Sequence, residues 1–225
     1  MQRSSGTFPP PWPSPREYTD GGKKEIYVIT GTDTDCGKTY CTLQLMRERQ
    51  ALGQSVIGIK PVSSGCIITP DGLRNDDAVQ LQHASSIALP YDVINPFAFK
   101  EPASPHISAA LAGIELTVAD IIRRLQPALN TACDVIFIEG AGGLMVPIND
   151  HELMIDLIKA LDVPVIFVTL MKLGCLNHTL LSFEALKSRQ IPIQHWIPNS
   201  IDHNMAYFAE NIAYLRLQLH SLTPA

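Results

Sequence analysis

The sequence predicts an α/β fold: a mostly parallel sheet with helices on both of its faces. Short apolar runs typical of buried strands alternate with amphipathic stretches along the chain, and such alternation forms parallel sheets with right-handed crossovers. Of the 225 residues, 46% are hydrophobic and 17% are charged, which is enough for one substantial core. We therefore expect residues 25–225 to form a single domain.

The amino-acid composition argues against a nucleic-acid-binding protein and a membrane protein. A formal net charge of −5 argues against nucleic acid as a partner, because proteins that bind phosphate backbones usually have a basic face. The longest apolar runs, such as 163–171, are about half of the ~20 residues needed to cross a bilayer, so we expect no membrane partner. The five cysteines are scattered and odd in number, which indicates reduced thiols in a cytoplasmic protein.

Residues 1–24 differ from the rest of the chain. Prolines at positions 9, 10, 11, 13 and 15 stand among Ser, Gly and charged residues, without an apolar segment or a periodic pattern. This composition is typical of a flexible proline-rich tail and not of a signal peptide.

The strongest motif begins with the apolar run Ile26–Ile29, which predicts a buried strand. The segment GTDTDCGKT at 31–39 then turns the chain into a helix. In such a loop the backbone N–H groups and the helix N-terminus bind phosphate, Lys38 adds a cation, and the Thr39 hydroxyl suits Mg²⁺. The motif predicts a nucleoside triphosphate site; the alternative is a glycine-rich turn that binds nothing.

This loop is a variant of the usual pattern G-x-x-x-x-G-K-[ST]. Counted back from Gly37, the first glycine should stand at position 32, but the chain has Thr32 there and Gly31 just before it. The strand, the glycine turn, the Lys-Thr pair and the helix still follow in the required order. We therefore keep the prediction of a phosphate site.

Gly53 ends this helix, and Ser55–Lys60 predicts a second strand bounded by Pro61. Lys60 then stands at the carboxyl end of a strand. Ligands collect at that edge of an open parallel sheet, so Lys60 is expected to face substrate and not solvent. The small polar segment 61–66 that follows is interpreted as an ordinary loop.

Residues 73–77 predict the start of another helix, with Asn75 or Asp76 as its N-cap. Asp77 has two interpretations: it favours the positive end of the helix, or it reaches the metal of a nucleotide site. The spacing does not choose between them. Residues 90–106 are predicted to form a proline-punctuated loop with short extended pieces at 95–96 and 104–106, before a helix near 107–112.

Thr117 and Asp120 show the spacing of a capping box, which predicts a helix through Leu129. The clearest strand, Asp134–Glu139, then ends on an acid that is followed by Gly-Ala-Gly-Gly. Enzymes that transfer phosphate place a carboxylate on Mg²⁺ at such a strand end, and a buried carboxylate without a metal would be costly to keep charged. Glu139 is therefore predicted to bind a metal.

Two more strands are predicted at Val163–Leu170 and Gln194–Asn199. A helix that ends near Arg189 lies between them, and a last helix, Met205–Leu219, closes the chain. Asn177 is expected to cap the first of these helices, whose N-terminus either holds an anion such as a substrate carboxylate or is a plain connection. One rim of the sheet then carries Lys38, Lys60, Glu139, Asn177 and Asn199. These cations, acids and amides indicate an ATP-dependent enzyme.

The chain resembles the dethiobiotin synthetase family, whose fold is similar to that of the P-loop NTPases. The resemblance covers residues 26–199 and rests on GTDTDCGKT, KPVSSG, GLRNDDA, EPASPHISA, EGAGGLMVP, KLGCLNH and a terminal Asn after a strand. It implies a homodimeric enzyme of biotin biosynthesis that uses ATP and Mg²⁺. The implied reaction converts 7,8-diaminononanoate and CO₂ into dethiobiotin, ADP and phosphate.

The resemblance also implies roles for single residues. The catalytic residues would be Lys38, Lys60 and Thr34, with Lys60 neutralising charge on a carbamate and on the transferring phosphoryl group. The metal ligands would be Thr39, Asp77 and Glu139. The nucleotide would contact Gly31, Thr32, Asp33, Asp35, Cys36, Gly37, Lys38, Thr39 and Tyr40, and Asn199 would bind the adenine. The substrate would contact Thr34, Lys60, Ser64 and, across a dimer interface, Gly174, Cys175 and Asn177.

The chain departs from the family in two places: the proline-rich tail is extra, and no obvious copy of the family's Pro-Leu-Gly segment follows the last helix. Two other classes were weighed. Partitioning ATPases, which act as nucleotide switches, carry an additional lysine early in the phosphate loop, where this chain has Thr32 and Asp33. An inactive relative that binds a partner would have no chemical need for a set such as Lys38, Thr39, Lys60 and Glu139.

Overall fold

The structure, a computed structural model, describes residues 24–200 and 205–222, so the tail expected at residues 1–23 lies outside the described residues. Its centre is a five-stranded sheet in the order β2-β7-β1-β8-β9, in which all neighbouring strands are parallel. The strands are β1 Glu25–Gly31, β2 Val56–Ile59, β7 Val135–Glu139, β8 Val165–Leu170 and β9 Ile193–Asn199. The predicted mostly parallel sheet is confirmed.

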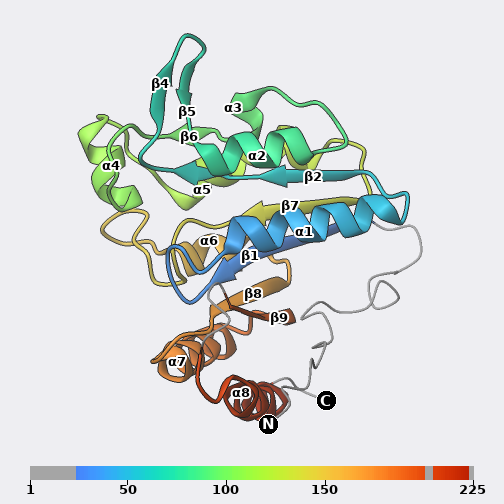
Figure 1. Cartoon of the computed structure of the whole chain (residues 1–225). Helices are drawn as coiled ribbons and strands as arrows, with labels where there is room; N and C mark the ends of the chain where they lie inside the picture. The colour runs from blue at the N-terminus through green and yellow to red at the C-terminus, as the bar shows by residue number, and fades with distance from the viewer. Residues whose placement is uncertain (1–23, 201–204, 223–225) are drawn as a thin grey trace.

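The sheet separates two apolar cores, because side chains alternate between its faces. Ile29 of β1 packs in the core beneath α1 (Lys38–Ala51) and Leu81 of α2, whereas Val28 belongs to the core on the other face. The helices are α2 Asp76–Ala84 beside α1, and α5 Val118–Leu129, α6 Met154–Leu161, α7 Cys175–Ser188 and α8 Phe208–Leu222 on the second core. Figure 1 shows α1 and α2 in front of the sheet and α6 behind it, which confirms helices on both faces.

Two segments predicted as loops contain short elements. Within 61–66, β3 (Val62–Ser63) pairs in parallel with β6 (Phe97–Ala98), and 90–106 also contains α3 (Tyr91–Ile94). A two-residue strand has too little sequence to show a period, and its pairing partner lies far along the chain. The hairpin of β4 (Ile67–Thr69) and β5 (Gly72–Arg74) was not predicted either; it stands out at the top of Figure 1.

Helix starts were predictable where a polar side chain caps them. The Thr117 hydroxyl accepts the Asp120 N–H at 3.1 Å at the start of α5, and the Asn75 side chain accepts from Ala78 N at 3.2 Å at the start of α2. The short helix α4, Pro105–Leu111, begins two residues before its predicted start. No helix was predicted at α6, whose N-cap is the apolar Leu153.

The expected cap of α7 was wrong. The helix begins at Cys175 after Gly174, which is in the left-handed region with φ 95° and caps without a side-chain hydrogen bond. Asn177 is therefore the third residue inside the helix. Glycine reaches positive φ without steric cost, so the turn is made earlier than the capping pattern indicates.

Three further features bear on the earlier expectations. No helix within 24–200 or 205–222 is long and apolar enough to cross a membrane. All five cysteines fall in these ranges and are free thiols.

Lys24, which was expected to belong to the tail, donates hydrogen bonds of 2.8 and 2.7 Å to the carbonyls of Leu129 and Thr131 at the end of α5.

Candidate active site

A pocket of about 300 Å³ lies at the carboxyl ends of β1, β2 and β7. This is the edge of a parallel sheet at which ligands bind. Of the five residues expected at one rim, Lys38, Lys60 and Glu139 line the pocket, whereas Asn177 and Asn199 do not. The full lining is Thr34, Asp35, Gly37, Lys38, Thr39, Lys60, Asp77, Glu139 and Gly142. The pocket is therefore built from the phosphate loop, the end of β2, the start of α2 and the end of β7.

The phosphate loop, residues 31–39, is held against β8. A Cβ atom on Gly31 would come within 2.5 Å of the Cys36 sulfur and 2.6 Å of the Val168 carbonyl oxygen, so no larger residue fits there. Thr32 continues the contact, since its N–H donates to Val168 O at 3.0 Å and its hydroxyl accepts from Leu170 N at 3.3 Å. This packing explains why the variant loop has its glycine at position 31.

Asn199, at the end of β9, fixes the second glycine of the loop. Its side-chain amide donates to the Cys36 carbonyl at 2.9 Å, and a Cβ atom on Gly37 would lie 2.0 Å from the same nitrogen. Gly37 also has φ 90°, which side chains rarely adopt. Asn199 thus braces the loop from behind and is not part of the pocket lining.

Lys38 and the first turn of α1 present polar groups to the pocket. Lys38 is 6% exposed, and its ammonium donates to the carbonyl of Asp33 at 2.7 Å, so the side chain lies along the loop. The carboxylate of Asp33 in turn accepts the Thr34 N–H at 2.8 Å. These contacts give the loop the closed shape of a cradle whose N–H groups and cation suit an anion.

The centre of the pocket is a group of three charges. The Lys60 ammonium lies 2.6 Å from a carboxylate oxygen of Glu139 and 3.0 Å from one of Asp77. Glu139 is 0% exposed and Lys60 is 6% exposed, whereas the Asp77 side chain is 40% exposed. We call Lys60, Asp77 and Glu139 the rim charge cluster.

The pKa values of Lys60 and Asp77 are both shifted by burial and by the neighbouring charges. Burial by itself would lower the pKa of Lys60, but the negative charges of Glu139 and Asp77 outweigh it, so the pKa is raised. Burial would likewise raise the pKa of Asp77, yet the Lys60 charge and hydrogen bond hold it below its usual value. At neutral pH Lys60 is therefore an ammonium and Asp77 a carboxylate.

The same atoms could hold a divalent cation. Thr39 donates its hydroxyl to Glu139 at 2.8 Å, and Lys60 shows that the carboxylates of Glu139 and Asp77 converge on a single cation. Oxygen donors from one or two carboxylates, completed by substrate phosphates, are what Mg²⁺ prefers. The donor set that the resemblance indicates for Mg²⁺ therefore fits the observed geometry.

Two residues of the site were not singled out from the sequence. Thr42 donates to the second Glu139 oxygen at 3.2 Å, and Gly142 lines the pocket opposite Thr34. Thr42 could have been found, because it stands three residues after Thr39 and so faces the same side of α1. Gly142 lies in a glycine run, which indicates close backbone approach without naming the ligand.

The remaining residues that were predicted to contact nucleotide or substrate do not line the pocket of the single chain. They are Gly31, Thr32, Asp33, Cys36, Tyr40, Ser64, Gly174, Cys175, Asn177 and Asn199. Asp33 and Cys36 belong to the loop and contact Lys38. Tyr40 is 57% exposed. The turn before α7 joins the end of β8 to that helix, and the neighbouring Leu173 is 97% exposed.

Comparison with known proteins places this arrangement in a family. The family model described as an AAA domain matches residues 25–219. The ATP-dependent dethiobiotin synthetase of Aeromonas salmonicida is 43% identical over 190 residues, which cover 84% of this chain and 84% of that protein. The same enzyme of Legionella pneumophila strain Corby is 45% identical over 196 residues, 86% of this chain and 88% of the relative.

Among solved structures, the kinase domain of the Escherichia coli tyrosine kinase ETK overlaps with a TM-score of 0.48 at 16% identity, over 82% of this chain and 71% of that one. A partial overlap of this kind carries no family assignment. The sequence identities do, because they extend over more than four fifths of both chains. The chain belongs to the ATP-dependent dethiobiotin synthetase family.

Proposed function

We propose that this chain is an ATP-dependent dethiobiotin synthetase that joins 7,8-diaminononanoate and CO₂ into a cyclic urea. The observation that carries the proposal is the position of Lys60, whose ammonium lies between two carboxylates in a pocket that also contains Lys38 and Thr39 of the phosphate loop. The pocket thus combines a phosphate cradle, a metal-type donor set and a buried cation within about 300 Å³. Each of these is needed for phosphoryl transfer to a carbamate.

The reaction has three bond-forming steps. One amine of the substrate adds to CO₂ and loses a proton, which gives a carbamate. A carbamate oxygen then takes the γ-phosphoryl group of ATP, and ADP leaves. The second amine attacks the activated carbonyl carbon, phosphate departs, and the ring closes as the amine loses its proton. The protein's part is positioning and electrostatic stabilisation.

The side chains of the pocket have distinct roles in this proposal. The phosphate loop, with Lys38 as its cation, binds the β- and γ-phosphates, and Lys60 stabilises the negative charge of the carbamate and of the transferring group. Thr34, exposed at the tip of the loop, lies at the substrate end with Ser64. Asn199 holds the loop and contacts the adenine. Lys60 is only 6% exposed, and charge interactions are stronger at such a site than in bulk water.

Mg²⁺ is the proposed metal, held by Thr39, Asp77 and Glu139, and it would neutralise the charge of the phosphates. We further propose a homodimer in which the turn 174–177 of one subunit binds the substrate carboxylate of the other, supported by Leu173, an apolar side chain that is 97% exposed. Residues 25–225 would form the catalytic domain and 1–24 a tail. The free cysteines support a cytoplasmic protein.

Isotope incorporation tests this function. The purified chain is incubated with MgATP, 7,8-diaminononanoate and ¹³C-bicarbonate, and the products are analysed by mass spectrometry. The proposal requires dethiobiotin with one ¹³C atom, formed only when ATP and the diamine are both present. ATP consumption without labelled dethiobiotin would reject it and favour a nucleotide switch.

A further inference from the structure

Asn95 is a buried polar residue that the reaction described above does not use. It is 3% exposed and follows α3, where Pro96 ends the helix because the residue before a proline disfavours the helical conformation. A buried amide must be hydrogen-bonded or it is costly to keep. The hydrogen-bond partners of the Asn95 side chain therefore indicate its structural role.

The Asn95 side chain hydrogen-bonds to the backbone of Lys60, a pocket residue, and to two hydroxyl groups behind the pocket. Its nitrogen donates to the backbone carbonyl of Lys60 at 2.6 Å, and its oxygen accepts from the Ser63 hydroxyl at 2.7 Å and the Tyr91 hydroxyl at 3.0 Å. The N–H of Lys60 also donates to Ile94 O at 2.9 Å. The backbone of Lys60 is thus held on both sides by the segment 94–95.

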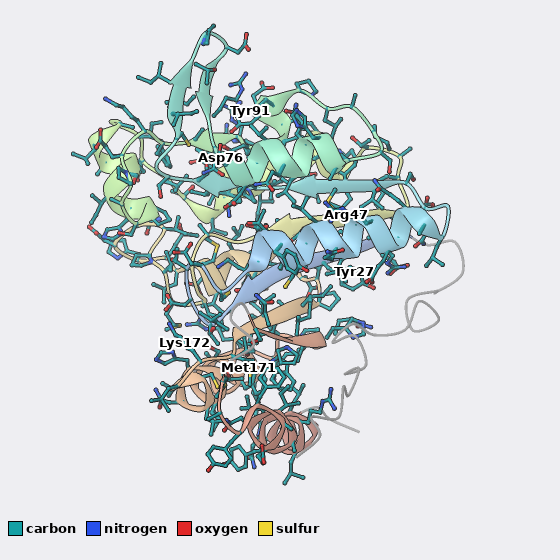
Figure 2. The ribbon with its side chains drawn as sticks, in the orientation of Figure 1. Tyr27, Arg47, Asp76, Tyr91, Met171 and Lys172 are labelled. Carbon is teal, nitrogen blue, oxygen red and sulfur yellow. The ribbon has the colours of Figure 1, made fainter. Side chains whose placement is uncertain are left out.

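The second arm of the network reaches the other side of the rim charge cluster. The Tyr91 hydroxyl, besides donating to Asn95, accepts the backbone N–H of Asn75 at 2.8 Å. Asn75 is the N-cap of α2, and Asp77 lies in the first turn of that helix. Figure 2 shows Tyr91 beside the end of α2 that carries Asp76, away from Tyr27 near β1.

A hydrogen-bond network outside the pocket therefore links Lys60 to the helix that carries Asp77. Lys60 directly follows β2 and Asp77 lies in α2, and their charged groups meet at 3.0 Å. One hydrogen-bonded path joins the backbone of Lys60 to the N-cap of the helix that carries Asp77, and it runs through the Lys60 carbonyl, the Asn95 amide, the Tyr91 hydroxyl and the Asn75 N–H. The Tyr91 ring is held in place by the Arg74 guanidinium, which lies 4.1 Å from the ring centre.

We propose that Asn95 and Tyr91 are positioning residues, which set the distance between Lys60 and the metal-binding carboxylate of Asp77. The inference rests on the proposed function, since it takes the roles of Lys60 and Asp77 from it. Removing a hydrogen-bond partner of a metal ligand typically costs 10–100-fold in metal affinity or activity. Tyr91 acts one contact further out, through the N–H of the N-cap Asn75, so the lower end of that range is expected. A hydroxyl that only stabilised the fold would change neither.

Tyr91→Phe is the test, because it removes the hydroxyl and keeps the ring beside Arg74. Its matched control is Tyr27→Phe, which removes a tyrosine hydroxyl that donates to Glu25 at 2.6 Å at the other end of β1. Diamine-dependent phosphate release, its half-saturating Mg²⁺ concentration and the melting temperature are measured for both. Mn²⁺ binding to the protein–ADP complex is followed by electron paramagnetic resonance.

For Tyr91→Phe we expect kcat to fall and the half-saturating Mg²⁺ to rise, each on the order of tenfold, with weaker Mn²⁺ binding and an unchanged KM for ATP. Tyr27→Phe should lower the melting temperature and leave the kinetics as in the wild type. If Tyr91→Phe keeps wild-type kinetics and metal binding, or if both variants lose activity equally, the inference is wrong. A wild-type protein without diamine-dependent release would instead reject the proposed function.

A double-mutant cycle identifies the residue through which Tyr91 acts. In an Asp77→Asn background, the change Tyr91→Phe should weaken Mn²⁺ binding no further, because the carboxylate that Tyr91 positions is already gone. Equal fold-effects in both backgrounds would show that Tyr91 acts elsewhere and would overturn the inference.

Discussion

Within residues 24–200 and 205–222, charged groups with a buried cation gather at each end of the central strands. At the carboxyl end lie Lys60, Asp77 and Glu139, the rim charge cluster. At the amino end of β1, the guanidinium of Arg49 pairs with the carboxylate of Glu25. Arg49 is 1% exposed, so both clusters place a cation almost out of contact with water.

The two clusters differ in what surrounds them. Around Arg49 and Glu25 the donors and acceptors bond one another: Arg49 donates to Gln54 at 2.9 Å and Tyr27 donates to Glu25 at 2.6 Å. Burial raises the pKa of Tyr27 far above its ordinary value, so this hydroxyl remains a proton donor. The rim charge cluster opens into a pocket. Buried charge alone therefore does not indicate function, whereas buried charge that lines a pocket beside a phosphate loop does.

The largest expected effect separates the clusters by activity. Lys60→Gln removes the cation from the rim charge cluster and should lower kcat by about 10²–10³-fold, as one lost transition-state contact does. Binding of ATP, measured by titration calorimetry, should change little because Lys38 and the loop are intact. Loss of ATP binding with a normal kcat at saturation would mean that Lys60 serves the nucleotide and not the carbamate.

A backbone change in the phosphate loop should come next. Gly37→Ala introduces a side chain at φ 90° and a Cβ atom 2.0 Å from the Asn199 amide, so it should displace the loop and weaken ATP binding by at least tenfold. The control is Gly53→Ala, where φ is 80° but no atom lies within 4 Å of the new Cβ. It carries only the backbone cost of about 1–2 kcal/mol. Equal ATP affinity in both variants would contradict the bracing role of Asn199.

The amino-end cluster should respond in stability alone. Glu25→Gln leaves the charge of Arg49 buried, and breaking such a pair costs about 3 kcal/mol of the free energy of unfolding. Urea denaturation measures this loss, and kcat below the transition should equal that of the wild type. A drop in kcat at full folding would show that the two ends of the sheet are coupled, and the contrast between the clusters would fail.

The smallest effect is a pH dependence. The Lys60 charge holds the pKa of Asp77 below its ordinary value, against the raising effect of burial. The pairing of ionised Asp77 with Lys60 therefore contributes fully to stability above the unfolded-state pKa of Asp77, about 3.9. This contribution is lost as the pH falls through the lower pKa of Asp77 in the folded protein. The difference in unfolding free energy between wild type and Asp77→Asn should be constant from about pH 5 to 8 and shrink below about pH 4. A constant difference down to pH 2 would contradict the pairing.

The sequence was most informative where local patterns are strong. Val135–Glu139 and the other sheet strands are apolar runs, so strands and their carboxyl ends were predictable, and with them Lys60 and Glu139. The helix α6 was missed because its N-cap, Leu153, is apolar and carries no capping signal. The strands β3 and β6 pair across a long stretch of chain and have no local period.

The site was predictable only as a set of residues that share a rim. The two interpretations of Asp77 stay open, because the packing of α2 on β2 brings its carboxylate to Lys60, a contact that the spacing did not indicate. Asn95 stands in an Asn-Pro pair, and this pattern indicates a turn irrespective of what the amide binds. Contacts that depend on the tertiary fold, such as that of Asn95 with the Lys60 carbonyl, cannot be predicted from the spacing of residues in the sequence.

We propose that the pocket beside the phosphate loop couples ATP cleavage to ring closure of a diamine. Phosphate release from MgATP and bicarbonate, measured with and without 7,8-diaminononanoate, tests it most directly. The claim predicts release that depends on the diamine and matches the dethiobiotin formed one to one. Release at the same rate without the diamine, or no release with it, would contradict the claim.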